Sequence, residues 1–326
     1  MNLALWCLCY AVLAILVVVL SAKLADYVDL IDKKTNISGA FIGGVILAAV
    51  TSLPELFTSF SAVVIVKNPS LVIGNILGSN LFNITIFGII MLIWAKKFSK
   101  ANVGKSHFKI TLFTLFLFAL MFFAVILGID YSLFNISIYS LIIIITYIIS
   151  IKYMANDDSD NDEKTNNPLT IKQIAVRFVI LAIILVSVSI AITYVTDILA
   201  DGFNLGATIA GALFLGIATS LPELTSTFAL AKKSNFNAAT GNILGSGVFN
   251  FAILSISDIL YRGGSVYISK DSKSLVIFGF IATFITGLCL FLKNRKSNNN
   301  NINFSIVYRI MGFLIVICYA LFIVLS

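Results

Sequence analysis

The chain has 326 residues, of which 59% are hydrophobic and 11% are charged, and its formal net charge is +7. A soluble domain of average composition carries about 25% charged residues, so this composition excludes a soluble globular protein. The apolar runs are each about 20 residues long, the length of a membrane-spanning helix, whereas the strands of a membrane β-barrel alternate over shorter segments. The sequence therefore predicts an all-α polytopic membrane protein.

Ten apolar segments are long enough to cross a bilayer as helices. The predicted spans are 3–21, 36–62, 70–94, 109–128, 132–151, 173–198, 205–230, 238–260, 274–292 and 305–325. A polar, acidic stretch from Ala155 to Pro168 separates five spans from five and reads as a solvated linker. We therefore expect a first unit over 1–153, a linker over 154–170 and a second unit over 171–326.

Lysine and arginine predict the orientation, because basic residues concentrate in cytoplasmic loops. The loops that follow odd-numbered spans are rich in these residues, whereas the loops that follow even-numbered spans hold only Lys67, Arg262, Lys270 and Lys273. The basic loops are therefore expected in the cytoplasm, with both termini outside a plasma (inner) membrane. The positive net charge follows from this topology, and no nucleic-acid partner is needed to explain it.

Two sequence blocks occur twice. The first block, TSLPEL, stands at Thr51–Leu56 and again at Thr219–Leu224. The second reads GNILGSNLFN over 74–83 and GNILGSGVFN over 241–250, at nearly the same distance from the first block. Because each half has an odd number of spans, homologous halves must insert with opposite orientation. The sequence therefore predicts two inverted five-helix repeats.

Each copy of the first block places a glutamate deep inside a predicted span, at Glu55 and Glu223. A lone charge at the bilayer centre costs at least about 2.5–3.5 kcal/mol. No lysine or arginine lies at a similar depth to neutralise either glutamate. Two facing carboxylates repel each other unless a proton or a cation lies between them. The two glutamates therefore indicate a cation site.

The neighbours of each glutamate supply further oxygen atoms. Thr51 and Ser52 share a helix face with Glu55. Pro54 has no N–H and leaves the carbonyl of Val50 without its helical donor. The second repeat copies this arrangement with Thr219, Ser220 and Pro222. A shell made only of oxygen suits a hard cation such as calcium, and not zinc or copper.

The second block carries a polar residue at every fourth position. These residues are Asn75, Ser79 and Asn83 in the first repeat, and Asn242, Ser246 and Asn250 in the second. Buried amide oxygens need partners, so this stripe is expected to face polar groups. Glycines with the same spacing, at 74, 78, 241 and 245, predict close helix packing.

The other reactive side chains predict no site. Cys7, Cys9, Cys289 and Cys318 lie in apolar runs without zinc-ligand spacing. His107, in a lysine-rich loop, is expected to be solvated. No base stands beside a nucleophile, so a hydrolase is disfavoured, and no cofactor is expected.

The motif pair TSLPE and GNILGSNLFN, repeated in an inverted second half, resembles the α-repeats of the cation/calcium exchanger superfamily, and specifically its sodium/calcium exchanger branch. The resemblance covers all ten spans. It implies that Glu55 and Glu223 coordinate calcium. It also implies that calcium and sodium sites are completed by Thr51, Ser52, the carbonyl of Ala48, Ser79 and Asn83, and by Thr219, Ser220, the carbonyl of Gly216, Ser246 and Asn250.

The resemblance implies a secondary antiporter that exchanges sodium for calcium by alternating access and exports calcium electrogenically on the inward sodium gradient. These ions and the lipid bilayer are its partners. Potassium-dependent relatives often have an aspartate where Asn83 and Asn250 stand, so potassium independence is expected. A second departure is Gly247, where the first repeat has Asn80. A calcium/proton antiporter is the alternative, although its GNxxE motif is missing, and an ion channel is disfavoured by the inverted repeats. We expect a monomer.

Overall fold

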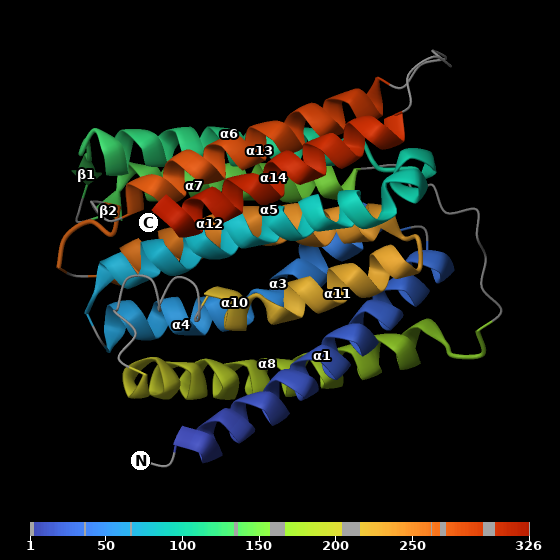
Figure 1. Ribbon diagram of the computed structural model, residues 1–326, viewed down its shortest axis with the longest axis horizontal. Coiled ribbons are helices and arrows are strands. Elements are labelled where there is room, and N and C mark those ends of the chain that lie inside the picture. Colours follow the sequence, from blue (N-terminus) through green and yellow to red (C-terminus); the bar gives the residue numbers. More distant parts are fainter. Residues whose placement is uncertain are drawn as a thin grey trace.

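The computed structural model is an almost entirely helical bundle (Figure 1). It describes residues 3–35, 37–65, 67–133, 136–156, 167–203, 216–261, 263–267, 272–295 and 304–325. Within these residues, eight helices are long and apolar enough to cross a membrane, and a ninth span results if one bent pair is counted as a single crossing. The prediction of an all-α polytopic membrane protein is confirmed.

The first half of the chain runs from α1 to α7. Its helices are α1 (Leu3–Lys34), α2 (Gly39–Phe41), the π-helical turn η1 (Ile42–Leu47), α3 (Ala48–Thr51), α4 (Leu53–Val64), α5 (Pro69–Lys100), α6 (Ser106–Met121) with its π-helical extension η2 (Phe122–Ile126), and α7 (Ile138–Ala155). Between η2 and α7 lies a two-stranded antiparallel hairpin of β1 (Ser132–Leu133) and β2 (Ile136–Ser137).

The second half runs from α8 to α14. Its helices are α8 (Ile171–Gly202), α10 (Gly216–Thr219), α11 (Leu221–Lys232), α12 (Phe236–Leu260), α13 (Lys273–Asn294) and α14 (Phe304–Leu325). The first part of the predicted span 205–230 lies outside the described residues, as does most of the predicted linker over 154–170.

Three predicted span boundaries are wrong by six residues or more, and one of them is the end of the third span, which continues from 94 to Lys100 in α5. α1 continues to Lys34, beyond the predicted end at 21, because Leu24 and Val28 extend its buried face. α7 begins at Ile138, beyond the predicted start at 132. The hairpin occupies the intervening residues, and the hydroxyl of Ser137 caps α7 by accepting from the N–H of Tyr139 at 3.3 Å.

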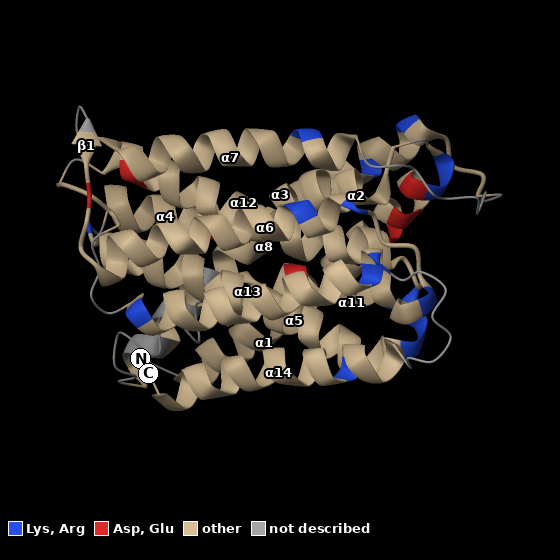
Figure 2. Ribbon diagram, turned by 90° about the horizontal axis from the view of Figure 1, so that it is seen from above, with Lys and Arg blue, Asp and Glu red and all other residues tan. Residues whose placement is uncertain are grey.

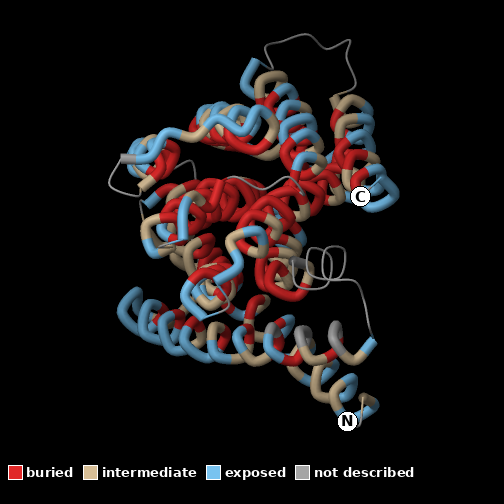
Figure 3. The backbone as a smooth tube through the Cα atoms, turned by 90° about the vertical axis from the view of Figure 1, so that its left-hand side faces the viewer, coloured by how far each residue is buried: buried red, intermediate tan, exposed pale blue. Residues whose placement is uncertain are grey.

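Helices α5 and α12 form the centre of the bundle. In each, 78% of the most apolar 18-residue stretch is buried, against 6% in α1. Figure 3 shows buried residues concentrated in the middle, while the two long helices at the bottom expose most of their length. These are α1 and α8, which pack along each other in a layer of their own, with α11 and α4 beside them (Figure 1). The second repeated block therefore lies at the core of the protein.

Glycines let the broken first-half helix approach α12 closely. A Cβ atom added at Gly245 would overlap the carbonyl of Gly44, and one at Gly241 would lie 2.9 Å from the backbone nitrogen of Gly44. The predicted close packing is thus confirmed for α12. It is wrong for Gly74, where an added Cβ would meet no described atom within 4 Å.

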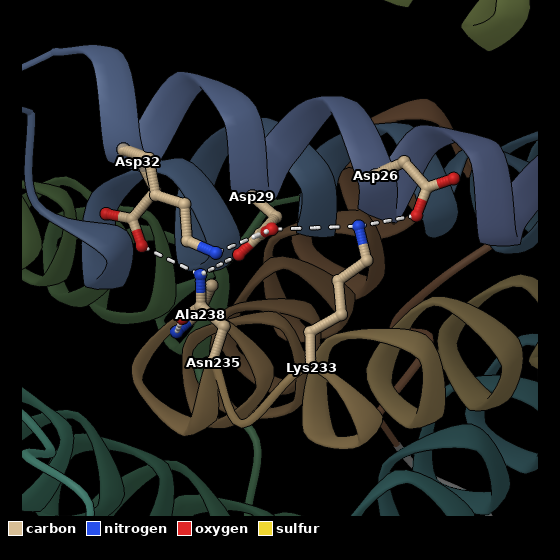
Figure 4. A network of polar contacts seen from close by, with 7 residues as sticks. Asp26, Asp29, Asp32, Lys233, Asn235 and Ala238 are labelled. Carbon is tan, nitrogen blue, oxygen red and sulfur yellow. Dashed lines mark hydrogen bonds and ion pairs between the residues drawn. The ribbon is translucent and has the colours of Figure 1, made fainter. Parts of the chain in front are cut away.

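A polar network ties α1 to the turn between α11 and α12 (Figure 4). The amide of Asn235 donates to Asp29 at 3.1 Å and to Asp32 at 2.7 Å. Lys233 makes ion pairs with Asp26 at 2.6 Å and with Asp29 at 3.6 Å. These contacts explain why α1 can carry acidic residues beyond its apolar part and remain helical there.

His107 is buried, so the prediction of a solvated histidine is wrong. It lies in the first turn of α6, and its Nε2 is 2.7 Å from Oδ1 of Asn237 in α12. The same oxygen accepts from the N–H of Gly104 at 3.0 Å, so the histidine Nε2 is the donor in this contact. The loop therefore folds back onto the central helix, which sequence position alone does not show.

Asp258, in the last turn of α12, is a buried carboxylate outside the repeated blocks. It accepts hydrogen bonds from the N–H of Ser137 at 2.9 Å, the hydroxyl of Ser140 at 2.7 Å and the N–H of Val266 at 3.1 Å. Three donors satisfy this acid, and it joins α12 to the hairpin and to the segment after α12. Its role is structural.

Lysine and arginine gather at one end of the bundle. Figure 2 shows most of the blue residues at the end opposite the two marked chain ends. This distribution follows the predicted division of the loops, with basic residues at one membrane face and both termini at the other.

Candidate functional site

Both TSLPEL blocks break a helix at their serine. α3 ends at Thr51 and α4 begins at Leu53, with a 42° bend between the two helical segments. Ser52 between them has φ −93° and ψ 8°, and its counterpart Ser220 has φ −90° and ψ 8°. A proline in the first turn of each following helix is the local cause, because it donates no N–H and blocks a continuous helix. The two repeats thus share one local geometry.

The break places Glu55 and Glu223 in the first turns of α4 and α11, and both are completely buried. Each glutamate is bonded by the serine of the other repeat. Ser52 donates to Oε1 of Glu223 at 2.8 Å, and Ser220 donates to Oε1 of Glu55 at 3.1 Å. The two halves of the chain therefore meet at one site, and the two acids belong to it together.

The central helices supply a second, longer contact to each acid. The hydroxyl of Ser79 in α5 lies 3.4 Å from Oε1 of Glu55, and that of Ser246 in α12 lies 3.5 Å from Oε1 of Glu223. Such distances mark weak hydrogen bonds. The second block of each repeat thus places its serine beside the glutamate of the first block, Ser79 beside Glu55 and Ser246 beside Glu223.

Several buried polar atoms of the predicted site residues have no hydrogen-bond partner among the described residues. They include Oε2 of Glu55, Oε2 of Glu223, Oδ1 of Asn250 and both polar atoms of the Asn83 amide. Buried polar atoms in folded proteins are nearly always satisfied, so a set of orphaned oxygens needs an explanation. A cation would use the free lone pairs of the carboxylate and amide oxygens in this set, whereas the Asn83 nitrogen is a donor and would need another partner.

The predicted threonines and backbone carbonyls belong to α3 (Ala48–Thr51) and α10 (Gly216–Thr219), the short helices that end at the two breaks. Thr51 and Thr219 are fully buried, and the Thr51 hydroxyl donates to the carbonyls of Leu47 and Ala48 at 3.1 and 3.3 Å. Gly216 is the first described residue of its segment and begins α10. The Ala48 carbonyl also accepts from the N–H of Ser52 at 3.0 Å.

The sequence did not indicate that serine and threonine hydroxyls accept hydrogen bonds from the side-chain amides of Asn75 and Asn242. Asn242 donates to Ser226 at 3.0 Å and to Thr227 at 2.8 Å. In the first repeat, Asn75 donates to Ser59 at 3.3 Å. Ser59 and Thr227 each follow a glutamate by four residues, and this shared offset is the signal that could have identified them.

No basic side chain among the described residues neutralises the two buried carboxylates of Glu55 and Glu223. In the described part of the chain, Asp26 and Asp29 of α1 pair with Lys233, Asp29 also pairs with Lys33 of the same helix, and neither glutamate takes part in an ion pair. The same residues contain no group of three or more His, Cys, Asp or Glu side chains that could hold a metal ion. Two carboxylates surrounded by hydroxyl, amide and carbonyl oxygens remain, a donor set that fits calcium or sodium.

Comparison with known proteins identifies the family of the chain. The family model described as "Sodium/calcium exchanger protein" matches residues 5–155 and 173–326. The chain belongs to the sodium/calcium exchanger family. Members of this family are transporters rather than enzymes, and the residues between the two matched segments coincide with the acidic linker.

Solved exchanger structures have the same fold. A structure of the sodium-calcium exchanger NCX_Mj soaked with 2.5 mM Na+ and 1 mM Sr2+ gives a TM-score of 0.71 at 23% identity, over 96% of this chain and 95% of that one. Another, soaked with 2.5 mM Na+ and 10 mM Sr2+, gives 0.69 at 21% identity over 98% of both chains. The ten-span plan with inverted repeats fits these relatives.

A curated relative matches over a shorter stretch. The Inner membrane protein YrbG of Escherichia coli (strain K12) is 29% identical over 112 residues. This match spans 33% of the present chain and 34% of the relative, about a third of each.

Proposed function

We propose that this exchanger-family chain is a secondary antiporter that moves sodium in one direction and calcium in the other by alternating access. The observation that carries the proposal is the crossed pair of hydrogen bonds, from Ser52 to Glu223 and from Ser220 to Glu55. It joins two buried acids from opposite repeats into one site. Their combined charge of −2 balances one calcium ion.

Calcium and sodium compete for this site because both are hard cations that bind oxygen. Calcium needs both carboxylates, since it carries two charges and prefers six to eight oxygen ligands. When calcium leaves, the two acids repel each other unless other cations take its place. Sodium ions fill that role, so that only an occupied site can change its exposure from one side of the membrane to the other.

We include electrogenic exchange in the proposal. Two carboxylates neutralise one calcium, and the hydroxyl, amide and carbonyl oxygens around them offer positions for more than two sodium ions. An exchange of more than two sodium ions for one calcium moves net charge across the membrane. A sodium concentration jump on proteoliposomes adsorbed to a capacitive electrode should therefore give a calcium-dependent current.

The orientation and the location belong to the same proposal. The basic end of the bundle lies in the cytoplasm, and both termini lie outside the plasma (inner) membrane, as the basic-loop rule predicts. The protein works as a monomer, because one chain supplies both repeats and both glutamates of the site.

The decisive experiment is uptake of calcium-45 by proteoliposomes that contain sodium, diluted into sodium-free buffer. We expect uptake that disappears when the internal sodium is replaced by choline. Vesicles carrying Glu55→Gln protein serve as the inactive control. Uptake driven by a pH gradient alone would instead support calcium/proton exchange, the alternative for a pair of buried acids. Absence of any uptake by folded protein would contradict calcium transport.

A further inference from the structure

The two repeats differ at the residue after the GS serine, where the first has Asn80 and the second has Gly247. Asn80 lies in α5 and is 1% exposed, so its amide needs protein partners. Both partners come from the second repeat. Nδ2 of Asn80 donates to the carbonyl of Gly247 at 3.2 Å, and Oδ1 of Asn80 accepts from Nδ2 of Asn250 at 2.9 Å.

The orientation of both amides is determined by the backbone carbonyl at Gly247. A carbonyl cannot donate, so Asn80 must turn its nitrogen toward it and its oxygen toward Asn250. Asn250 in turn must offer its nitrogen to Asn80. Its oxygen is then directed away from Asn80, and that atom is buried and has no partner among the described residues.

Gly247 places no side chain beside the Asn80 amide. A Cβ atom built there would lie 3.9 Å from Oδ1 of Asn80, so a longer side chain at this position would compete for the space that the Asn80 amide fills. The asparagine at this contact between α5 and α12 comes from the first repeat. The two halves of the site are therefore unequal.

The two repeats also differ in how they hold Asn83 and Asn250, which occupy equivalent positions in the second block. The amide of Asn250 is held by Asn80, whereas both polar atoms of Asn83 lack partners in the described part of the chain. A donor atom fixed before the ion arrives costs less ordering entropy on binding than a free one. Asn250 is thus a prepared ligand, and Asn83 must be ordered by the ion.

We propose that Asn80 is a positioning residue, which presents the Asn250 oxygen to the transported cation and makes the second repeat the better prepared half of the site. This inference rests on the proposed exchange function. It assigns a role to a residue whose side-chain hydrogen bonds, among the described residues, go to Gly247 and Asn250 and to neither glutamate. It predicts that the effect of Asn80 passes through Asn250.

The test is a double-mutant cycle read out as sodium-driven calcium-45 exchange in proteoliposomes. Asn80→Ala should raise the half-saturating calcium concentration about five-fold, the equivalent of one hydrogen bond, with little change in the maximal rate. In the Asn250→Ala background, Asn80→Ala should have no further effect. In the Asn83→Ala background it should again cost about five-fold. Independent effects of Asn80→Ala and Asn250→Ala that multiply would overturn the proposal.

A swap variant tests the same idea without removing the asparagine. Asn80→Gly combined with Gly247→Asn moves the amide to the other repeat, and the inverted symmetry then directs it toward Asn83. We expect the affinity to return to within about two-fold of wild type, and the coupling to transfer from Asn250 to Asn83. Coupling that stays with Asn250 would contradict the proposal.

The exchange function and the role of Asn80 can be disproved separately. If wild-type protein exchanges calcium but the cycle is additive, only the role of Asn80 is wrong. If folded wild-type protein, checked by size-exclusion chromatography, takes up no calcium, the proposed function and this inference both fall. Variants that do not elute as a single monodisperse peak are replaced by Asn80→Ser, which keeps a small polar group but cannot bridge Gly247 and Asn250.

Discussion

Glu55 and Glu223 are fully buried and make no ion pair within the described residues, and their Oε2 atoms lack protein donors. A carboxylate kept in this condition is costly, and its retention needs a function. Glu55→Gln and Glu223→Gln should each abolish sodium-driven calcium uptake, because one remaining negative charge cannot balance a divalent ion. The measurement is calcium-45 uptake by proteoliposomes, with folding checked by thermal unfolding in detergent.

The glutamine variants should be no less stable than wild type, since each removes a buried charge. Asp258→Asn provides the matched contrast, because Asp258 is equally buried but accepts three hydrogen bonds. An asparagine there must turn its NH2 group toward a donor, at a cost of about 1–3 kcal/mol in the free energy of unfolding. This variant should lose stability and keep exchange activity. The opposite pattern, active glutamine variants and an inactive Asp258→Asn, would reverse the assignment.

Asn83 and Asn250 offer neutral amide oxygens and add no charge for a further monovalent ion. Sodium-driven calcium flux should therefore be unchanged when potassium is replaced by choline on both sides, with the membrane potential clamped by a protonophore at equal pH. A flux that collapses without potassium and recovers on millimolar addition would show that the charge argument is wrong. Asn250→Asp is the complementary variant, and it should change the dependence on monovalent cations.

At the scale of elements, Asn235 joins two helices through one side chain. Its Oδ1 caps α12 by accepting from the N–H of Ala238 at 3.1 Å, and its Nδ2 bonds Asp29 and Asp32 of α1. Asn235→Ala should lower the free energy of unfolding by about 2–3 kcal/mol, because it removes a cap worth about 1 kcal/mol and a donor shared by two carboxylates.

Asn68→Ala is the control for that loss, since Asn68 caps α5 through the N–H of Ser70 at 3.2 Å and has no other described side-chain contact. It should cost only the cap, about 1 kcal/mol. Thermal unfolding of both purified variants in the same detergent provides the comparison. Equal losses would mean that the contacts from Asn235 to α1 contribute no stability.

At the scale of the whole molecule, the gathering of basic residues at one end predicts the orientation in the membrane. Cysteine accessibility in a cysteine-free background tests it. Lys105→Cys, at an exposed turn of the basic end, should be protected from an impermeant thiol reagent in intact cells. Tyr131→Cys, at a position that is 72% exposed near the other end, should be labelled.

Permeabilised cells are the control, in which both cysteines should react. Ser99 is unsuitable for this purpose, because it is only 9% exposed and the protein itself would shield a cysteine there. Labelling of Lys105→Cys and protection of Tyr131→Cys in intact cells would invert the topology and the orientation of both repeats.

Much of the site could be predicted from local sequence. The prolines predict the helix breaks that the structure has, and the duplicated blocks predict an inverted pair of repeats. The two glutamates in apolar segments predict one buried acidic site, and its cation stays a prediction. These conclusions depend on backbone chemistry, on symmetry and on the cost of charge in lipid, which are properties of short segments. The burial of α5 and α12 also agrees with the amide stripes that their sequences carry.

The partners of these residues were decided only by the tertiary structure. The sequence placed Ser52 on the face of Glu55, yet its hydroxyl bonds Glu223, because the break at Ser52 turns this side chain toward the other repeat. His107 was expected in solvent and lies against α12. Asn80 was noticed only as a difference from Gly247, and its bond to Asn250 appears when the two central helices pack. Sequence periodicity determines which face of an element is polar, whereas the packing of distant elements determines what that face meets.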